Sequence, residues 1–380
     1  MEVLGFTEQH KQYRQQLKEY LKREIIDHIN TWEADHLTPK SAWQKIGAAG
    51  YLCPWVKPEY GGMGGDFLHS LIVIEEFTRT NHTGLLVNLH NDIVVPYIDS
   101  FGTEAQKHQY LPGCVSGDII SAVAMTEPDA GSDLASMGTT AVEDGDEIII
   151  EGSKTFISNG INCDLVIVAA KDPSEPKAHK AISLYLVEDG TQGFKKGSKF
   201  EKMGMHSQDT AELFFTNCRI PKDNMLGKKG HGFVMLMQKL QQERLVCAIQ
   251  ALACAEFVLD WLVDFCRNPP SKLPALSASQ AVQFAIAEMA TDVEIGRTFL
   301  YKLVADHIEK QNVVLQTSMA KFWMTDMTKR ISSRALSLIG EFGAHEKCPI
   351  VRSWRDAQVW SILAGTNEIM KAIIFNELNK

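Results

Sequence analysis

Two segments of the chain present hydroxyl groups and backbone amides where an apolar, β-favouring run ends. The first reads Ala124-Met125-Thr126-Glu127-Pro128-Asp129-Ala130-Gly131-Ser132-Asp133, and the second reads Phe156-Ile157-Ser158-Asn159-Gly160. Hydroxyl, Gly and Pro residues after such runs favour turns, which expose amides and side-chain oxygens at strand ends. Together the segments predict a surface that holds a polar, planar ligand. Each segment alone would be read as an ordinary strand-to-turn transition.

A third feature is a carboxylate on an apolar helical face. Leu236, Leu240, Glu243 and Cys247 recur at helical spacing, so they share one side of a helix. An apolar surrounding raises the pKa of a carboxyl group because it disfavours the charged form, and this suits a general base that works near neutral pH. The alternative is that the run Gln241-Gln242-Glu243-Arg244 forms a solvated face of the helix.

The motifs of the chain resemble those of the acyl-CoA dehydrogenase family. The pattern T-E-P-x-A-G-S-D followed by [WF]-I-[ST]-N-G is similar to the flavin-binding middle of that family. Further matches lie in order along almost all of the 380 residues: Pro58-Glu59-Tyr60-Gly61-Gly62, Phe101-Gly102-Thr103-Glu104, Lys202-Met203-Gly204, Thr210-Ala211-Glu212-Leu213, Glu243-Arg244 and Gly365-Thr366-Asn367-Glu368-Ile369.

The resemblance implies a noncovalent FAD and the α,β-desaturation of an acyl-CoA thioester. In the family, a carboxylate removes the α-proton while the β-hydrogen leaves as hydride to flavin N5. The thioester carbonyl oxygen is held by a backbone N–H and a ribityl hydroxyl, which stabilise the charge that develops on it. The resemblance also implies that the electrons pass to an electron-transfer flavoprotein.

The position of the base distinguishes two branches of the family. Most members carry it in a Tyr-Glu-Gly-Thr near the C-terminus, but here the segment reads Leu363-Ala364-Gly365-Thr366. A minority branch, which resembles the long-chain and isovaleryl enzymes, places Glu just before a helix arginine, as in Glu243-Arg244. The resemblance therefore implies that Glu243 is the base, with Ala364 still able to supply the backbone N–H.

The remaining roles are carried over from the family by position. The flavin ring is expected to meet Met125 and Thr126 with Ile157 and Ser158, with Phe156 covering it where Trp is common. The full expected cofactor set is Val123, Met125, Thr126, Gly131, Ser132, Phe156, Ile157, Ser158, Gln280, Thr366 and Glu368. The expected substrate set is Ser132, Asp92, Arg244, Leu363 and Ala364. Asp92 lies in a segment that borders the acyl pocket in the family, and the alternative is a helix-surface Asp. No metal site is expected.

Two departures affect the adenosine half of the FAD site. Relatives usually carry an Arg-x-x-Phe-Gly before the position of Gln280 and a Gln-x-x-Gly-Gly later in the chain. Here those regions read Arg267-Asn268-Pro269-Pro270-Ser271-Lys272 and Ser337-Leu338-Ile339-Gly340-Glu341. Gln280 is kept, and Arg267 is a candidate substitute for the missing arginine.

Composition and charge exclude several other classes of protein. The net charge of -9 and the pI near 5.8 argue against unspecific nucleic-acid binding. The eight cysteines are scattered, with no C-x-x-C pair, as expected for reduced thiols of a cytoplasmic protein. The sequence shows neither a secretory signal nor an uninterrupted apolar run of membrane-spanning length, so no membrane insertion is expected.

The predicted fold is α+β, in three parts. An N-terminal α-helical domain covers 1–118, a middle antiparallel β domain with the flavin site covers 119–226, and a C-terminal four-helix bundle covers 227–380. The expected helices are 7–29, 41–49, 67–79 and 84–100 in the first part and 233–265, 281–310, 315–339 and 359–378 in the last. Because the last set is strongly apolar, a homo-oligomer is expected, with a tetramer favoured.

Two alternative functions come from other classes. One is an oxidase or dehydrogenase that acts on a carrier-protein-bound or alicyclic acyl thioester, and aerobic peroxide release would identify the oxidase. The other is a flavin-poor relative kept as a binding or assembly protein, which would purify without colour. The sequence does not indicate the length, branching or ring content of the acyl group.

Overall fold

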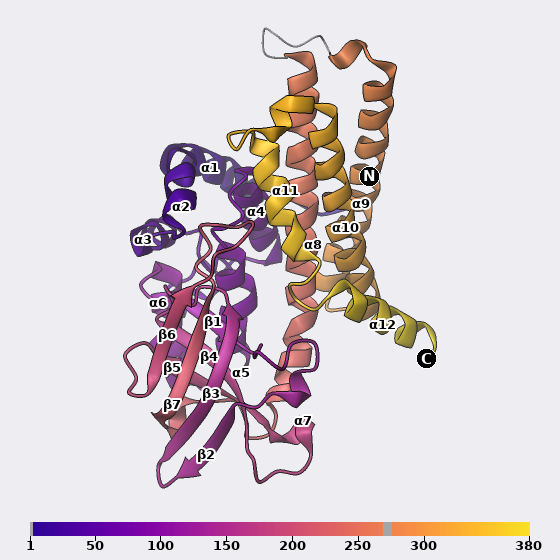
Figure 1. Cartoon of the computed structure of the whole chain (residues 1–380). Helices are drawn as coiled ribbons and strands as arrows, with labels where there is room; N and C mark the ends of the chain where they lie inside the picture. The colour runs from indigo at the N-terminus through magenta and orange to yellow at the C-terminus, as the bar shows by residue number, and fades with distance from the viewer. Residues whose placement is uncertain (1–2, 269–275) are drawn as a thin grey trace.

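The computed structural model describes residues 3–268 and 276–380, and it shows helices at both ends of the chain with a sheet between them (Figure 1). The N-terminal helices are α1 (Glu8–Glu24), α2 (Ile29–Asp35), α3 (Lys40–Ala48), α4 (Phe67–Arg79), α5 (Val95–Phe101) and α6 (Glu104–Ser116), with the 3-10 turns η1 (Ile26–His28) and η2 (Pro58–Tyr60) and the π-helix η3 (Leu89–Val94). The predicted helix 67–79 is confirmed as α4, whereas α2 and α6 were not predicted as separate helices.

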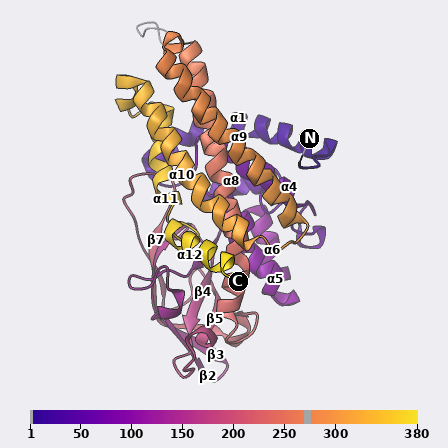
Figure 2. The ribbon, with the colours of Figure 1, turned by 90° about the vertical axis from the view of Figure 1, so that its right-hand side faces the viewer.

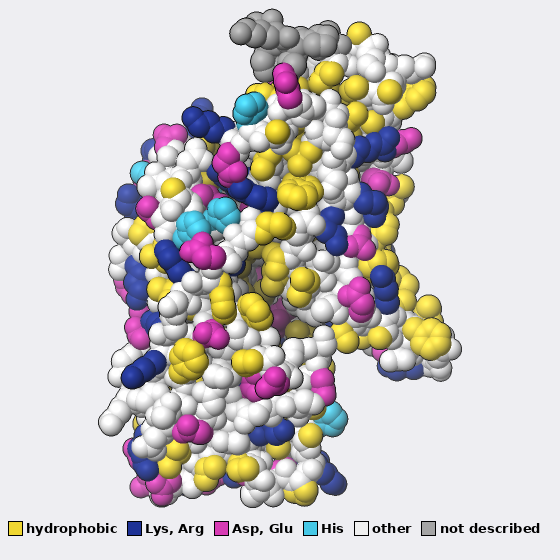
Figure 3. All heavy atoms as spheres, in the orientation of Figure 1, with side chains coloured by type: hydrophobic (Ala, Val, Ile, Leu, Met, Phe, Trp, Pro, Cys, Tyr) yellow, Lys and Arg dark blue, Asp and Glu magenta, His cyan; other side chains and the backbone are white. Residues whose placement is uncertain are grey.

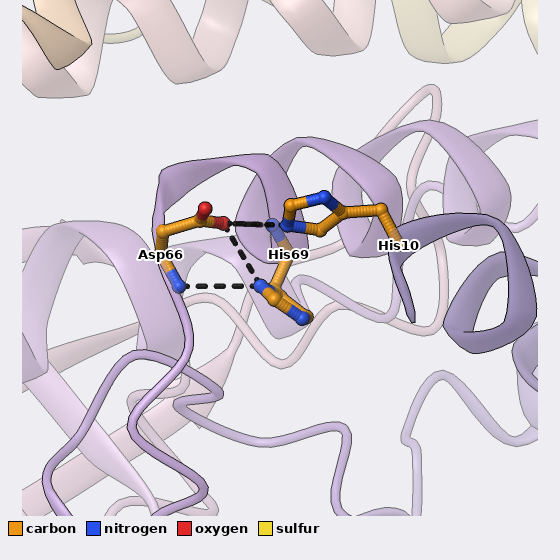
Figure 4. Close-up of side chains that lie close together, drawn as sticks. All are labelled: His10, Asp66 and His69. Carbon is orange, nitrogen blue, oxygen red and sulfur yellow. Dashed lines mark hydrogen bonds and ion pairs between the residues drawn. The ribbon is translucent and has the colours of Figure 1, made fainter. Parts of the chain in front are cut away.

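Helices α1 and α4 begin with capping boxes that meet at one carboxylate. Thr7 and Asp66 are the N-caps, and His10 and His69 reach back to the cap amides, which satisfies donors that a helix start leaves unpaired. Asp66 Oδ1 lies 3.1 Å from His10 Nε2 and 2.9 Å from His69 Nδ1, and Figure 4 shows both rings beside it. This contact fixes α1 on α4, which in turn packs on the central helix of the molecule.

The middle part is one eight-stranded sheet. Its strands are β1 (Ser121–Ala124), β2 (Thr140–Asp144), β3 (Glu147–Ile157), β4 (Leu165–Lys171), β5 (Ile182–Glu188), β6 (Phe194–Lys199), β7 (Ala211–Pro221) and β8 (Met225–Leu226), with the short helix α7 (Ala178–Ala181) and the 3-10 turns η4 (Leu134–Ser136) and η5 (Lys222–Asn224) between strands. The order is β6-β7-β3-β2-β4-β5-β8, and β1 pairs with β4.

The sheet is mixed rather than purely antiparallel, which corrects the prediction. Strand β1 pairs with β4 in parallel, from Ser121 opposite Leu165 to Ala124 opposite Val168. A parallel pair needs a long connection, and the polar loop after β1 together with the β2–β3 hairpin provides it. The turn of that hairpin contains Gly145, which has φ +61°.

The C-terminal part is built on α8 (Gly232–Arg267), with η6 (Leu276–Ala278), α9 (Gln280–Ile308), α10 (Val314–Leu338), η7 (Gly340–Ala344), α11 (Pro349–Trp360) and α12 (Asn367–Leu378). Figure 2 shows α9 and α10 running alongside α8. Helix α8 is long and apolar enough to cross a membrane, but 78% of its most apolar window is buried inside the protein, as in the core helix of a bundle.

The predicted helix 359–378 is wrong, because the chain breaks there into two helices. Helix α11 ends at Trp360, and α12 begins at Asn367 with Thr366 as its N-cap. Between them, Ala364 and Gly365 have left-handed backbone with φ 55° and 91°, which an α-helix cannot contain. Figure 1 shows α12 leaving the bundle at this corner.

Candidate active site

The two polar segments singled out in the sequence lie side by side in the structure. The amide of Thr155 donates to the carbonyl of Thr126 over 2.9 Å, and Lys154 Nζ donates to the carbonyl of Met125 over 3.1 Å. The end of β3 therefore holds the chain that follows β1, so that the segment after Ala124 and the segment before Gly160 form one surface.

A buried ion pair fixes the loop that follows β1. Lys154 is fully buried and donates to Glu127 Oε1 over 2.7 Å, while the same oxygen accepts from the amide of Thr139 over 3.0 Å. Burial lowers the pKa of Lys154 to about 8, and Glu127 opposes that shift. Burial acts to raise the pKa of Glu127, but the hydrogen bonds from Lys154 and Thr139 outweigh it and lower the pKa.

The surface between these segments carries donors that the described residues leave unpaired. The hydroxyls and the backbone amides of Thr126, Ser132 and Ser158 have no hydrogen-bond partner within 3–268 and 276–380. Phe156 has φ +57°, and its side chain is 66% exposed and stacked on Phe200 with ring centroids 5.2 Å apart. The other predicted positions here are Val123 and Met125, half-buried, Gly131, exposed, and Ile157, buried.

Glu243 lies in the interior on α8, where the sequence predicted an apolar stripe. Leu236, Leu240 and Cys247 are buried beside it, and Glu243 itself is only 4% exposed. Burial raises the pKa of Glu243 to about 7, and Tyr97, Arg244 and Lys239 act against the shift. The solvated-face alternative is therefore excluded.

Tyr97 is the direct partner of this carboxylate. Its hydroxyl donates to Glu243 Oε1 over 2.9 Å, and its side chain is fully buried on α5. Sequence reasoning did not single out Tyr97, because 146 residues separate it from Glu243 and no motif includes it. An aromatic hydroxyl in an apolar helical segment was the available signal.

Arg244 faces the corner between α11 and α12. Its side chain is 9% exposed and has no hydrogen-bond or ion-pair partner among the described residues. A Cβ placed on Gly365 would lie 4.0 Å from the Arg244 terminal nitrogen. At the same corner, the backbone amide of Ala364 has no acceptor in the described chain. The structure thus brings Arg244, the residue next to Glu243, to the corner at Ala364 and Gly365.

The neighbours of Ala364 have structural partners as well. Leu363 packs half-buried against the main core, and Thr366 Oγ1 accepts from the amide of Ile369 over 3.2 Å. Glu368 is exposed in the first turn of α12. An acid in the first turn of a helix interacts favourably with the helix dipole, so capping alone accounts for both Thr366 and Glu368 in the free chain.

Asp92 contacts α8 through its backbone and not through its carboxylate. Its backbone carbonyl accepts from Gln242 Nε2 over 2.7 Å, but its carboxylate is 1% exposed and faces Ser70 and Trp55 in the N-terminal domain. Burial raises the pKa of Asp92 to about 7. Asp92 is thus a core residue, neither on the helix surface nor turned to the carboxylate of Glu243.

Gln280 is also separated from the rest of the predicted set. It is exposed at the start of α9, at the end of the bundle where α8 finishes at Arg267. Figure 1 shows this end and the sheet at opposite ends of the molecule. The segment Pro269-Pro270-Ser271-Lys272 lies outside the described residues.

The site combines unpaired donors at the strand ends of the sheet with a buried carboxylate of raised pKa. The family descriptions that match are "Acyl-CoA dehydrogenase, N-terminal domain" over 7–118, "middle domain" over 122–218 and "C-terminal domain" over 230–378. The chain belongs to the acyl-CoA dehydrogenase family, whose members bind FAD.

Individual relatives cover nearly the whole chain. The long-chain specific acyl-CoA dehydrogenase of Rattus norvegicus is 38% identical over 375 residues, which are 98% of this chain and 87% of the relative. The crystal structure of an acyl-CoA dehydrogenase from Geobacillus kaustophilus is 46% identical, with a TM-score of 0.97 over 99% of both chains. A prolyl acyl carrier protein oxidase, AnaB, is 27% identical, with a TM-score of 0.91 over 99% of this chain and 100% of that chain.

The residues present fit an FAD. A flavin ring offers carbonyl and nitrogen acceptors along one edge, and the unpaired amides and hydroxyls of Thr126 and Ser158 are donors for such an edge. The exposed ring of Phe156 supplies an aromatic face, and the unpaired donors of Ser132 suit a phosphate.

Proposed function

We propose that the chain catalyses the α,β-dehydrogenation of an acyl-CoA thioester and that Glu243 is the base. One observation carries the proposal: a buried carboxylate with a pKa raised to about 7 lies beside Arg244, which reaches the corner where the Ala364 amide is unpaired. A base of this pKa is half deprotonated near neutral pH and can accept a weakly acidic proton.

The chain's own residues divide the reaction between them. The Ala364 amide holds the thioester carbonyl oxygen, which acidifies the α-proton. Tyr97 occupies Oε1 of Glu243, which leaves Oε2 to accept that proton. Bound FAD supplies the acceptor for the hydride that leaves the β-carbon. The apolar neighbours of Glu243 exclude water, so the proton stays on the carboxylate.

The proposed cofactor site uses the surface at the ends of β1 and β3. Thr126 and Ser158 hold the ring edge, and Phe156 covers its face. Gly131 and Ser132 hold the pyrophosphate, and the remaining members are Val123, Met125, Ile157, Thr366 and Glu368. Because Gln280 lies at the far end of the bundle, we propose that it holds the adenosine of another subunit's FAD.

The proposed substrate site contains Ser132, Arg244, Leu363 and Ala364. Arg244, a buried guanidinium without a partner in the described chain, faces the polar end of the acyl group. We leave the carboxylate of Asp92 out of this site, because it is turned to Ser70 and Trp55.

We propose a homo-oligomer, with a tetramer favoured. Large apolar side chains are exposed on the C-terminal part: Phe284 58%, Ile295 56%, Ile362 61%, Phe375 67% and Leu378 66%. Figure 3 shows hydrophobic side chains along the edge of the bundle and at its protruding end. Exposed apolar surface of this extent favours a subunit interface. Light scattering during size exclusion tests this, and a stable monomer would contradict it.

The proposal also covers the electron acceptor, the cellular location and the domain boundaries. We propose that the electron acceptor is an electron-transfer flavoprotein and that the protein works in the cytoplasm. We also propose that the domains divide at 118 and 226, near the ends of α6 and of β8.

The decisive experiment is anaerobic reduction of the purified yellow protein by a panel of acyl-CoA thioesters that differ in length, branching and ring content. Loss of flavin absorbance with at least one thioester supports the proposal. A protein that binds FAD but is bleached by none contradicts it.

The second candidate function is oxidation of a carrier-protein-bound acyl or aminoacyl thioester. The similarity to a prolyl acyl carrier protein oxidase favours keeping it. Peroxide released under air, with carrier-bound thioesters turned over faster than CoA thioesters, would select this candidate.

A further inference from the structure

Lys321 is a lysine with no exposed surface in the middle of the bundle. It lies on α10, and its ammonium donates to the carbonyl of Gly365 over 2.6 Å and to Asn367 Oδ1 over 3.0 Å. Burial lowers its pKa. A buried charge is costly unless it is hydrogen-bonded, so both acceptors help to keep this ammonium in the interior.

Both acceptors belong to the corner between α11 and α12. The backbone is left-handed at two successive residues, Ala364 and Gly365, and this conformation is strained for a residue with a side chain. Asn367, just past the corner, is held to α10 a second time, because its Nδ2 donates to Asp326 Oδ1 over 3.0 Å. Helix α10 therefore determines the shape of the corner.

That shape determines the direction of the Ala364 amide. The amide has no acceptor in the described chain, so no hydrogen bond of its own fixes it. The Gly365 carbonyl is one residue away, and the Lys321 ammonium anchors it. An apolar side chain at 321 would leave that carbonyl without a donor and the corner free to relax.

The charge of Lys321 also suits this place. Burial is the main cause of the lowered pKa of Lys321, and the nearby charge of Arg244 lowers it further. Arg244 approaches Gly365 from the side of α8. Two cations thus flank the corner, where negative charge develops on a carbonyl oxygen held by the Ala364 amide.

We infer that Lys321 is a positioning residue for the thioester carbonyl. It holds the corner so that the Ala364 amide points at the substrate oxygen, and it does not touch substrate itself. The inference rests on the proposed function, because it takes the Ala364 amide as the carbonyl donor.

The test uses the FAD-loaded enzyme and an aryl-enoyl-CoA, a chromophoric thioester whose absorption band moves to longer wavelength when its carbonyl is polarised. Lys321→Met is compared with wild type and with Arg330→Met, which removes a half-exposed cation from the same helix. FAD is kept in excess, and the melting temperature checks the fold.

We expect the absorption band of the bound thioester to shift to longer wavelength in wild type and in Arg330→Met. In Lys321→Met at least half of that shift should be lost. In Lys321→Met the rate of flavin reduction should fall about tenfold or more. This is less than the loss of about 100-fold or more that follows deletion of an oxyanion donor itself. KM should change by less than about threefold. If Lys321→Met does not fold, Lys321→Leu, which also removes the ammonium donor, replaces it. A full shift with wild-type reduction in either folded variant overturns the inference. If the absorption band does not shift in the wild-type enzyme, the result contradicts the proposed carbonyl site at Ala364 and not the role of Lys321.

Discussion

Tyr97 Oη lies 2.9 Å from Glu243 Oε1, and this hydrogen bond joins α5 of the N-terminal part to α8 of the C-terminal part. Both side chains are buried, so no bulk water competes for the carboxylate oxygen. One Oε is therefore fixed, and the rotation of the carboxyl group with it. The orientation of the proposed base depends on two elements that are far apart in the sequence.

Glu243→Gln should reduce the rate of flavin reduction by substrate about 10²–10⁴-fold, the usual contribution of a general base. The amide keeps the shape and can still bond Tyr97, so FAD and ligand binding should persist. Stopped-flow reduction under anaerobic conditions measures this. Glu256→Gln is the matched control, because Glu256 is a buried carboxylate on the same helix that pairs with Arg297 over 2.8 Å. Near-wild-type reduction in Glu243→Gln would remove it as the base.

The pH dependence of kcat/KM should show a limb that rises with pH through about 7. The base acts deprotonated, so activity is lost as pH falls through the raised pKa of Glu243. Tyr97→Phe removes a donor that favours the charged form, and the midpoint should therefore move to higher pH. A midpoint that stays in place or moves to lower pH would show that Tyr97 does not tune this carboxylate.

Moving the carboxylate should restore part of the lost activity. Glu243→Gly abolishes the base, and adding Ala364→Glu places a carboxylate at the position that most of the family uses. Ala364 already has φ 55°, so the larger side chain adds little backbone strain. Single-turnover reduction of Glu243→Gly and of the double variant is compared. No gain in the double variant would show that the two positions do not reach the same atom here.

Lys154→Met should weaken FAD binding about tenfold or more, since hydrogen bonds to a charged group contribute roughly 1.5–3 kcal/mol. The variant releases the Met125 carbonyl and leaves Glu127 without its cation. Fluorescence titration of the apoprotein with FAD measures this. Lys199→Met is the control, because Lys199 is another lysine of the sheet and donates to the Asp35 carbonyl at the end of α2. Equal losses in both variants would indicate a general effect on the sheet.

Asp92→Asn should stabilise the protein at alkaline pH and leave turnover unchanged. The folded state raises the pKa of Asp92 from 3.8 to about 7, so the unfolded chain binds fewer protons between these values, and stability falls as pH rises through that window. An uncharged amide removes this penalty. The melting temperature should rise by about 2 °C or more at pH 8 relative to wild type and by less at pH 5. A loss of activity with any acyl thioester would give Asp92 a direct role.

The periodicity of the sequence predicted much of the fold and the environment of the proposed base. Leu236, Leu240 and Cys247 surround Glu243 because residues on one face of a long helix stay together whatever packs against them. The partners of that face were not predictable, because Tyr97 meets Glu243 only after three-dimensional packing. Lys321 was missed for the same reason, since nothing in its own helix indicates that its ammonium lies on Gly365.

The errors in secondary structure have local causes. Strand β6, Phe194–Lys199, consists mostly of Lys, Gly and Ser and lacks the alternation that marks a strand. The break between α11 and α12 was missed although Gly365 and Thr366 are a stop and a cap, because apolar residues continue on both sides. Strand β1 gave no sign of its parallel pairing, which depends on the long connection that follows it.

The contact between Arg244 and the Gly365 corner suggests how the two branches of the family, which differ in the position of the base, could have diverged. The proposed base and the proposed carbonyl donor lie on separate elements, a helix and a loop, and neither element includes the strands that form the proposed cofactor surface. A lineage can therefore gain a carboxylate at the loop position while the helix position is still occupied, and lose the older one afterwards. Two adjacent carboxylates raise one another's pKa, so a protein that carried both would be expected to work at higher pH, and no step on this path would lack a base.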